Sequence, residues 1–419
     1  PSRGRRMTSV RRVPHGFRRD PLHILLMNEY FPPDTSATAK MARLVAEKLA
    51  ERHRVTVLCG RPSYDPSERH PYYFWRRETQ GNLTVERVGS TAFPRFRMRQ
   101  RVGNYLSYLA LAVPRAMAIK ADVILAMTDP PVEGIAGAMA ARMTGRPFVY
   151  NIRDLYPDMA LGGGIIAPSK WVERWERMHR RALRQASRVI VLGEDMRDRI
   201  VGKGVDPERV VIVRDGVAVP ETVASAEHPL AQEVRCGFRF VIVHAGNLGF
   251  YGAWDTLVGA ARRLEGDGVG LVFVGDGAVK AQVEAAAAGS RAVRFLPFRP
   301  AEQVPYVLAA GDLHVVTVKP GLEGVVVPSK LYGILAAGRP VLAIAPEESD
   351  VVRIVRRTGC GVAADPREPE AVAEAVRSLA RDPERLAHMG RRAREIAHEY
   401  DRVSQLEKFV QVVEEAGRC

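Results

Sequence analysis

Short apolar runs alternate with stretches of helical periodicity along most of the chain, from residue 21 onward. Residues 23–27 form an apolar run that predicts a buried parallel strand. A helix is expected to begin near Ser36, because apolar residues then recur at helical spacing through Ala50. Residues 55–58 form the next apolar run and complete a strand–helix–strand unit. Such a unit predicts a doubly wound α/β sheet.

The same alternation continues and then restarts, which predicts two doubly wound domains. In the first half, strands are expected at 123–127, 147–152, 189–192 and 210–213, with a helix at 132–143. A linker without periodicity is expected near 220–236. In the second half, strands are expected at 240–244, 271–274, 293–296, 313–318 and 341–344. Helices are expected there at 254–264, 278–287, 302–309, 329–337, 369–380 and 384–398.

The predicted fold is therefore α/β, with two Rossmann-like domains that face a central cleft. We expect a basic, disordered extension over 1–20, a first domain over 21–222, a second over 236–398 and a C-terminal segment over 399–419. Its helix, near 401–416, is expected to return to the first domain. In open α/β sheets the loops at the carboxyl ends of the strands bind ligands, so these loops should line the cleft.

Composition and charge narrow the class of protein. The chain has 419 residues, of which 46% are hydrophobic, enough for two cores. Its four cysteines lack C-x-x-C spacing, so neither zinc nor a disulfide is expected, and a reducing, cytoplasmic compartment is favoured. No apolar run is long enough for a transmembrane helix, and no apolar stretch follows the seven arginines of the first 20 residues as in a secretory signal. The net charge of +14 indicates an anionic partner or surface.

Residues 323–341 carry the most informative motif, Glu-Gly-Val-Val-Val-Pro-Ser-Lys followed by Ala-Ala-Gly-Arg-Pro-Val. Pro328 suits the first turn of a helix. Unpaired backbone amides at a helix start attract a phosphate, and Lys330 adds a point charge that suits a diphosphate. Gly338 and Pro340 predict the end of the helix. The alternative is a buried helix with an exposed lysine, and the local pattern leaves both open.

Two further loops follow predicted strands of the second half. Residues 244–252 read His-Ala-Gly-Asn-Leu-Gly-Phe-Tyr-Gly, a glycine-rich turn with the geometry of a phosphate cradle or of a simple strand-to-helix turn. Residues 273–277 read Phe-Val-Gly-Asp-Gly, which we interpret mainly as a turn. Neither domain has G-x-G-x-x-G after its first strand, which argues against a dehydrogenase.

In the first half, Arg153-Asp154-Leu-Tyr-Pro-Asp follows a strand. A carboxylate at the carboxyl end of a strand can orient or deprotonate a hydroxyl, so Asp154 is a catalytic candidate; helix capping is the competing interpretation. Asp65, Asp129 and Glu347 also follow strands and rank lower.

Together these motifs resemble family 4 retaining glycosyltransferases of GT-B fold, most closely the branch that acts on bacterial surface polysaccharides and lipid-linked sugars. The resemblance extends over about 21–410 and implies an acceptor-binding first domain and a donor-binding second domain. It implies that the donor is bound by a set of residues from the three loops of the second domain: Gly246, Asn247, Gly249, Phe298, Glu323, Gly324, Val325, Ser329 and Lys330. Lys330 is also a catalytic candidate. Phe298 belongs to a loop, 295–298, whose backbone contacts the base in the family.

The resemblance further implies that the acceptor side is lined by Thr35, Ser36, Arg153 and Asp154. One departure concerns the family's two glutamates, which are separated by seven residues. Depending on the register, the second position holds Gly333 or Leu331, so the ribose contact has no carboxylate.

Positive charge gathers in the first half beside aromatic and apolar residues. Residues 170–188 contain seven basic residues with Trp171 and Trp175 on one helical face, and four arginines (95, 97, 99 and 101) precede an aromatic and apolar stretch. Such stretches suit an anionic membrane surface, although a solvated basic face is an equal alternative. Nucleic acid ranks last, because no motif supports it.

The sequence thus predicts transfer of a sugar from a nucleoside-diphosphate sugar to a hydroxyl acceptor, such as a polyprenyl-diphosphate-linked sugar. Retention is implied by the resemblance. No cofactor and no metal are expected. The enzyme is expected in the cytoplasm, peripherally attached to the inner face of the membrane. A sugar-nucleotide 2-epimerase and a non-catalytic partner subunit are the competing functions.

Overall fold

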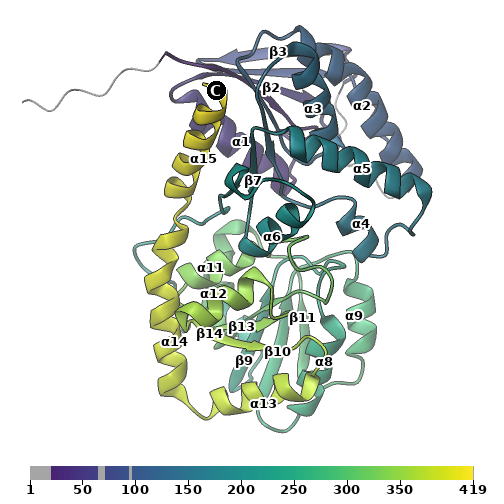
Figure 1. The fold of residues 1–419 in the computed structure, drawn as a ribbon. Coiled ribbons are helices and arrows are strands. Elements are labelled where there is room, and N and C mark those ends of the chain that lie inside the picture. The colour runs from purple at the N-terminus through teal and green to yellow at the C-terminus, as the bar shows by residue number, and fades with distance from the viewer. Residues whose placement is uncertain (1–19, 65–70, 94–96, 419) are drawn as a thin grey trace, which may run out of the picture.

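The computed structural model describes residues 20–64, 71–93 and 97–418. Two α/β domains lie one above the other and are joined along one side by the C-terminal helices (Figure 1). The predicted extension at 1–20 lies almost wholly outside the described residues, as do Asp65 and Arg95.

The N-terminal sheet has eight strands in the order β3-β4-β2-β1-β5-β6-β7-β8. All neighbours are parallel except β3 and β4. The strands are β1 (His23–Met27), β2 (Arg54–Gly60), β3 (Trp75–Gln80), β4 (Leu83–Val88), β5 (Val123–Ala126), β6 (Phe148–Asn151), β7 (Arg188–Val191) and β8 (Val210–Ile212). The helices are α1 (Ala37–Ala50), α2 (Met98–Ala118), α3 (Glu133–Thr144), α4 (Asp158–Gly162), α5 (Lys170–Gln185) and α6 (Glu194–Gly202).

Strand alternation divides this domain into two cores. Leu25 and Met27 point to the face that α2, α3 and α5 cover, whereas Ile24 and Leu26 point to the face of α1. Both faces are buried, as in parallel sheets with helices on each side.

The C-terminal sheet has six parallel strands in the order β11-β10-β9-β12-β13-β14. They are β9 (Phe240–Ala245), β10 (Val269–Val274), β11 (Val293–Leu296), β12 (Leu313–Thr317), β13 (Val341–Ile344) and β14 (Gly361–Ala364). The helices are α7 (Pro229–Arg235), α8 (Trp254–Arg263), α9 (Lys280–Ala286), α10 (Val304–Ala310), α11 (Lys330–Ala336), α12 (Asp350–Thr358), α13 (Pro369–Ala380) and α14 (Pro383–Ile396). Short 3₁₀ turns complete the chain at η1 (Pro207–Arg209), η2 (Ala301–Gln303) and η3 (Ala397–Tyr400).

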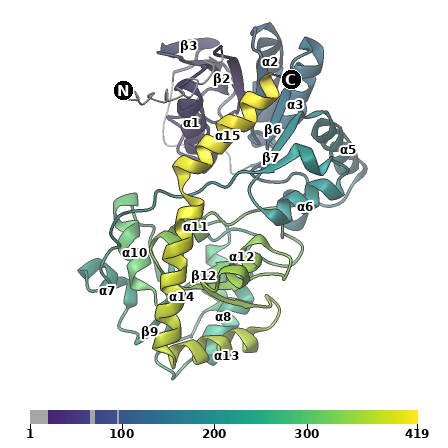
Figure 2. The same cartoon turned by 60° about the vertical axis from the view of Figure 1, so that its left-hand side comes forward.

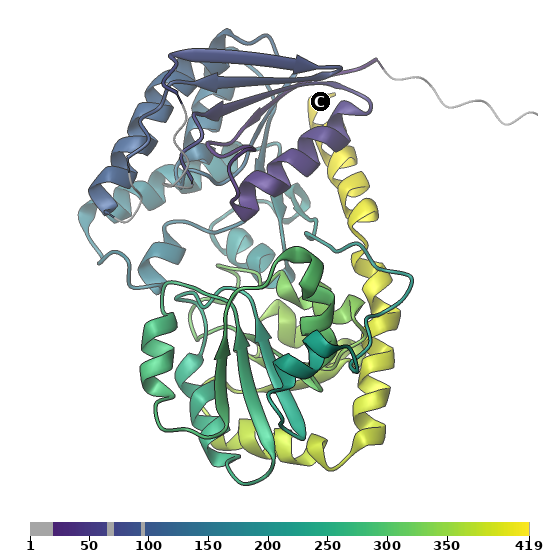
Figure 3. The same ribbon diagram turned by 180° about the vertical axis from the view of Figure 1, so that it is seen from behind.

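The last helix, α15 (Arg402–Gly417), leaves the C-terminal domain and packs against the N-terminal one (Figures 2 and 3). Phe409, Val410 and Val413 are buried with residues of α1 and β5. Nε2 of His53 lies 2.9 Å from a carboxylate oxygen of Glu414. The predicted return of the C-terminal helix is therefore confirmed.

The segment expected to be a linker without periodicity is partly helical. Its residues 229–235 form α7, which packs against α10 of the C-terminal domain. Pro229 stands in the first turn, and the ring of His228 accepts a hydrogen bond from the Leu230 amide at 3.2 Å. The irregular part of the connection is thus shorter than predicted. Among the described residues, no helix is long and apolar enough to span a bilayer.

Candidate active site

The two domains touch through the very segments that the sequence singles out. The backbone of Asp154, which follows β6, pairs with that of Val326, which follows β12. The Leu155 amide donates a hydrogen bond of 3.0 Å to the Val325 carbonyl. These loops lie at the carboxyl ends of the two sheets, as the rule for open α/β sheets predicts. A group bound beside one loop is therefore close to the other domain.

Lys330 lies beneath the glycine-rich turn that follows β9. A Cβ atom added at Gly246 would be 3.9 Å from its Nζ. The same Nζ lies 3.2 Å from Nε2 and 3.4 Å from Nδ1 of His244. Burial holds the pKa of the His244 ring well below its usual range, and the Lys330 charge lowers it further, so the imidazole is neutral.

Burial also lowers the pKa of Lys330 to about 7. No carboxylate among the described residues forms an ion pair with its ammonium group. A desolvated cation beside a glycine turn is a strong binding point for an anion, because little competing water or countercharge surrounds it. This arrangement favours the diphosphate interpretation of Lys330.

The turn itself is held open by glycines. Gly246 has φ +128°, and its amide donates to the Val274 carbonyl at 2.9 Å. A Cβ atom at Gly275 would lie 2.2 Å from the Gly246 carbonyl, so only glycine fits there. The segment 273–277, interpreted mainly as a turn, thus packs against the glycine-rich turn at 244–252.

The amide of Leu248 is not available to a ligand. It donates a hydrogen bond of 2.9 Å to the Asp276 carbonyl. Tyr251 and Trp254 donate to the carbonyls of Asn247 and Gly249, at 3.0 and 2.8 Å. The turn over 247–249 therefore offers fewer free amides to a phosphate than the sequence suggests. The exposed Asn247 side chain is its most accessible group.

The first residues of the predicted donor segment form the seam between the domains. Oε1 of Glu323 accepts from Arg199 of α6 at 3.3 Å, and Oε2 accepts from the Gly321 amide at 2.8 Å. A Cβ atom at Gly324 would lie 2.4 Å from the Asp195 carbonyl, so the Gly324 backbone packs closely against α6 of the other domain. Gly324 and the fully buried Val325 therefore contact the N-terminal domain, and their role in holding the diphosphate stays a prediction.

Helix α11 begins at Lys330, two residues after Pro328. Ser329 is its exposed N-cap residue and makes no capping hydrogen bond through its side chain. The amide of Leu331 donates to the Pro328 carbonyl at 3.2 Å, which makes the first turn tight. The two registers of the family's second glutamate correspond to the buried Leu331 and to Gly333, so neither places a carboxylate on this helix.

On the N-terminal side, Arg153 is fully engaged. Its two terminal nitrogens form a bidentate ion pair with Asp215 at 2.7 and 2.6 Å. This ion pair holds the loop that carries Asp154, and the acceptor contact of Arg153 stays a prediction. Burial raises the pKa of Asp154 to about 6, and the nearby Asp129 contributes. A carboxyl with that pKa can exchange a proton near neutral pH, as a catalytic group must.

Sequence profiles of two glycosyltransferase families match most of the chain. The family described as "Glycosyl transferase 4-like domain" matches residues 36–216, and "Glycosyl transferases group 1" matches residues 234–396. The chain belongs to the family 4 type of glycosyltransferases. Its classification as a glycosyltransferase is thereby confirmed, and the two α/β domains of the structure confirm the predicted fold class. Neither an epimerase nor a non-catalytic subunit gains support.

Individual relatives agree with this assignment. The enzyme is 26% identical over 300 residues to a probable glycosyltransferase WbjE of Pseudomonas aeruginosa, covering 70% of this chain and 74% of that one. It is 25% identical over 380 residues to a putative colanic acid biosynthesis glycosyl transferase WcaI of Escherichia coli, covering 85% and 91%. Its fold is similar to that of Alr3699/HepE of Anabaena in complex with UDP, with a TM-score of 0.68, 19% identity and coverage of 94% and 100%.

The remaining predicted residues of the glycosyltransferase are spread around this centre. Oγ of Ser36 accepts from the Ala39 amide at 3.0 Å and caps α1, and Ser36 is buried, whereas Thr35 is exposed. Phe298 is exposed after β11.

Glu347 pairs with Arg356 on the wall of a cavity of about 460 Å³ that Glu323 also lines. That cavity lies toward β13 and β14, and Gly246 and Lys330 are not part of its lining.

A group of carboxyls beneath the acceptor side was largely missed. Asp129 accepts from the Thr38 hydroxyl, and its amide donates to the side chain of Asn28 at 3.3 Å. Glu133 is buried, accepts from the Tyr108 hydroxyl at 2.9 Å and has a pKa well above its usual range because of burial. In the sequence Glu133 resembles an ordinary acidic residue at a helix start. Only its position soon after a strand could have indicated that it lies near the site. Among the described residues, no group of potential ligands could hold a metal ion.

Proposed function

We propose that this glycosyltransferase uses a nucleoside-diphosphate sugar, retains the anomeric configuration and transfers the sugar to a hydroxyl of a lipid-linked acceptor at an anionic membrane surface. The observation that carries the donor assignment is the Lys330 ammonium group beneath the Gly246 turn. Structures of Alr3699/HepE hold UDP and UDP-glucose, which supports a nucleotide sugar as donor.

The chemistry follows from the charges around Lys330. As the sugar leaves, negative charge grows on the nucleoside diphosphate, and a fixed cation in a poorly solvated place stabilises that charge. We infer that Asp154, which lies beside the Leu155–Val325 contact, orients the attacking hydroxyl. Retention rests on the family resemblance. The coupling constant of the anomeric proton in the product, measured by NMR, tests it.

A thermal-shift screen tests the donor. UDP, GDP, ADP and dTDP, together with UDP-glucose and GDP-mannose, are added separately to the wild-type protein. A nucleotide that binds the folded state should raise the melting temperature. Lys330→Ala should abolish this shift, whereas Lys408→Ala, an exposed lysine of α15, should retain it. A full shift in Lys330→Ala, or none in the wild type, would contradict the assignment.

The membrane proposal rests on the layer formed by α2, α3 and α5, which contact one another in that order. Large apolar side chains are exposed along it: Met98, Val102 and Leu106 on α2, Met139 and Met143 on α3, and Trp171 and Met178 on α5. Exposed arginines accompany them: Arg99, Arg142, Arg174, Arg177 and Arg181. Apolar side chains among arginines suit the interface of an anionic bilayer.

The two tryptophans of α5 differ in a way that the sequence did not predict. Trp171 is 78% exposed, whereas Trp175 stacks on Tyr156 with ring centroids 5.9 Å apart. Trp175 therefore anchors the helix to the domain, and Trp171 is free to enter a lipid surface.

Vesicle flotation tests this surface. The protein should bind vesicles that contain phosphatidylglycerol and bind less to vesicles of phosphatidylcholine alone. The double variant Trp171→Ala/Leu106→Ala should weaken binding. Trp75→Ala removes another exposed tryptophan, from the edge strand β3 outside this layer, and is the control. An equal loss of vesicle binding in the control variant, or equal binding to vesicles with and without phosphatidylglycerol, would refute the proposed surface.

A further inference from the structure

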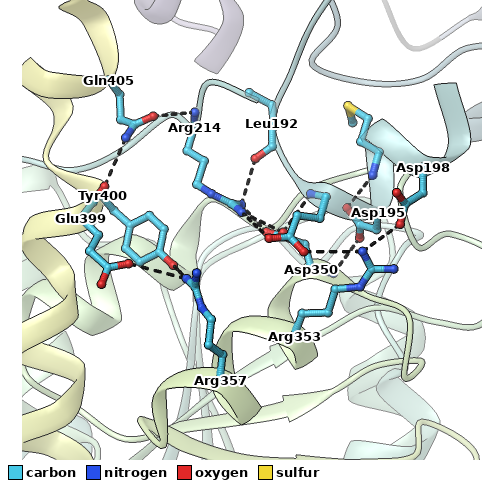
Figure 4. A network of polar contacts seen from close by, with 12 residues as sticks. Leu192, Asp195, Asp198, Arg214, Asp350, Arg353, Arg357, Glu399, Tyr400 and Gln405 are labelled. Atoms are coloured by element: carbon cyan, nitrogen blue, oxygen red, sulfur yellow. Dashed lines mark hydrogen bonds and ion pairs between the residues drawn. The ribbon is translucent and has the colours of Figure 1, made fainter. Parts of the chain in front are cut away.

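Arg214 follows β8 of the N-terminal domain and contacts the C-terminal domain at several points (Figure 4). Its guanidinium pairs bidentately with Asp350, the first residue of α12, with Nη2 to Oδ1 at 3.0 Å. Nη1 also donates to the Leu192 carbonyl at 3.3 Å, which ties the group to its own sheet. Both side chains of the pair are nearly inaccessible to solvent.

The same guanidinium reaches the helix that carries Lys330. Its positive charge acts on the hydroxyl of Tyr332, which lies two residues after Lys330 on α11. Its carbon lies 5.6 Å from the ring centre of Tyr400, and the rings of Tyr332 and Tyr400 are 5.2 Å apart. The backbone amide of Arg214 donates to Gln405 of α15 at 2.9 Å. One residue thus joins α11, α12 and α15 to the acceptor domain.

Two aspartates strengthen this contact by capping helices reciprocally across the domains. Asp350 accepts from the Glu194 amide, at the start of α6, at 2.9 Å. Asp195 of α6 accepts in turn from the Asp350 amide, at the start of α12, at 2.9 Å. Each helix start therefore receives a carboxylate from the other domain, which favours one relative placement of the two. Gly193 permits the approach, because a Cβ atom there would lie 2.9 Å from Cγ of Asp350.

We propose that Arg214 is a positioning residue for sugar transfer: with Asp350 and Tyr332 it fixes the Lys330 helix against the acceptor domain. The residues that we expect to bind the diphosphate, Gly246 and Lys330, both belong to the C-terminal domain. Donor binding therefore does not need Arg214, whereas transfer does, because the acceptor side must be held at one distance from the donor.

The test compares three variants. Arg214→Lys keeps the charge but loses the bidentate geometry. Arg214→Met/Asp350→Asn removes both charges, so no unpaired charge stays buried. Arg353→Met is the matched control, because Arg353 of α12 pairs with Asp198 of α6 at 2.8 Å across the same seam, at a more exposed place and with no contact to Tyr332. Thermal melting first establishes that each variant folds.

Small-angle X-ray scattering of the protein without nucleotide gives the first readout. Both Arg214 variants should show a larger radius of gyration than the wild type, and the Arg353 variant should not. The dissociation constant of the nucleoside diphosphate that binds in the thermal-shift screen gives the second, and it should stay at the wild-type value. The third is turnover, measured as release of that diphosphate from its sugar nucleotide, which should fall about a hundredfold, the loss expected for a misplacement of about 1 Å.

Unchanged scattering, unchanged turnover in a folded variant, or an equal loss of binding and turnover would each overturn the proposal. The second and third readouts rest on the proposed donor. If no nucleotide binds the wild type, the donor assignment fails and the scattering comparison still decides the role of Arg214.

Discussion

The pKa of Lys330 predicts how donor affinity changes with pH. In the free enzyme this pKa is lowered to about 7 because the side chain is buried without a countercharge. Only the protonated form attracts a diphosphate, so the dissociation constant should be nearly constant below pH 7 and rise above it. Each further pH unit should cost about tenfold, and affinity at pH 8.5 should be about thirtyfold weaker than at pH 6, or about 2 kcal/mol.

The sign follows from linkage. A bound diphosphate favours the ammonium form and raises the pKa of Lys330, so binding takes up a proton when the pH is above 7. Isothermal titration calorimetry with a sugar nucleotide, in buffers of different ionisation enthalpy, measures both the affinity and the proton uptake. A sugar nucleotide is the right probe, because its diphosphate has no free terminal phosphate group that titrates near neutral pH.

Lys330→Arg is the decisive control. Arginine stays protonated at every pH used, so the variant should bind without this pH dependence and without proton uptake. A wild-type dissociation constant that is flat between pH 6 and 8.5 would refute the link between burial and binding. So would an arginine variant that keeps the wild-type slope.

Three further predictions concern stability. Lys330→Met should raise the melting temperature of the nucleotide-free protein, because it removes a buried unpaired cation, while it abolishes the shift caused by nucleotide; a lower melting temperature would contradict this. Gly324→Ala should destabilise the protein by about 2 kcal/mol more than Gly321→Ala, because both have positive φ but only Gly324 meets the Asp195 backbone, and urea denaturation measures the difference. Glu133→Gln should be at least as stable as the wild type at pH 8, and its stability relative to the wild type should increase between pH 5 and 8. The reason is that a protein with a carboxyl of raised pKa loses stability as the pH rises; equal pH profiles of the two proteins would contradict this.

Most strands that the sequence predicts are buried on both faces, and the edge strands β8 and β11 are the partly exposed exceptions. His23–Met27 and Val341–Ile344 are continuous apolar runs, and the structure places them as predicted. The missed strand β3, Trp75–Gln80, is exposed along its whole length at the edge of the sheet, so its sequence contains no apolar run to detect. The missed strand β14, Gly361–Ala364, is the edge strand of the C-terminal sheet next to β13. Its short sequence of mostly small residues does not form a recognisable apolar run.

The site could be predicted only where one continuous segment makes it. Lys330 and Gly246 belong to motifs that each follow a single strand, and the structure brings them together. Arg153 and Ser36 are predicted to line the acceptor side, and in the structure they also have partners within the chain: Asp215 pairs with Arg153, and the Ala39 amide donates to Ser36. Sequence spacing does not reveal such partners, because they depend on which loops the fold places side by side.

The contact between the two domains gives a second example of partners that the sequence does not reveal. Asp195 and Asp350 each stand in the first turn of a helix, where an acidic residue normally stabilises its own helix. In the structure Asp350 accepts from the Glu194 amide of the other domain, and Asp195 accepts both from the Asp350 amide and from the Met196 amide of its own helix. The backbone of Gly324, which the motif would assign to a phosphate, packs against Asp195. The ligand-binding amides of a family motif and the contacts that close a two-domain enzyme thus draw on the same backbone groups. Which use prevails is decided by the facing domain, so in this chain the diphosphate assignment rests on Lys330 and its glycine turn rather than on residues 323–325.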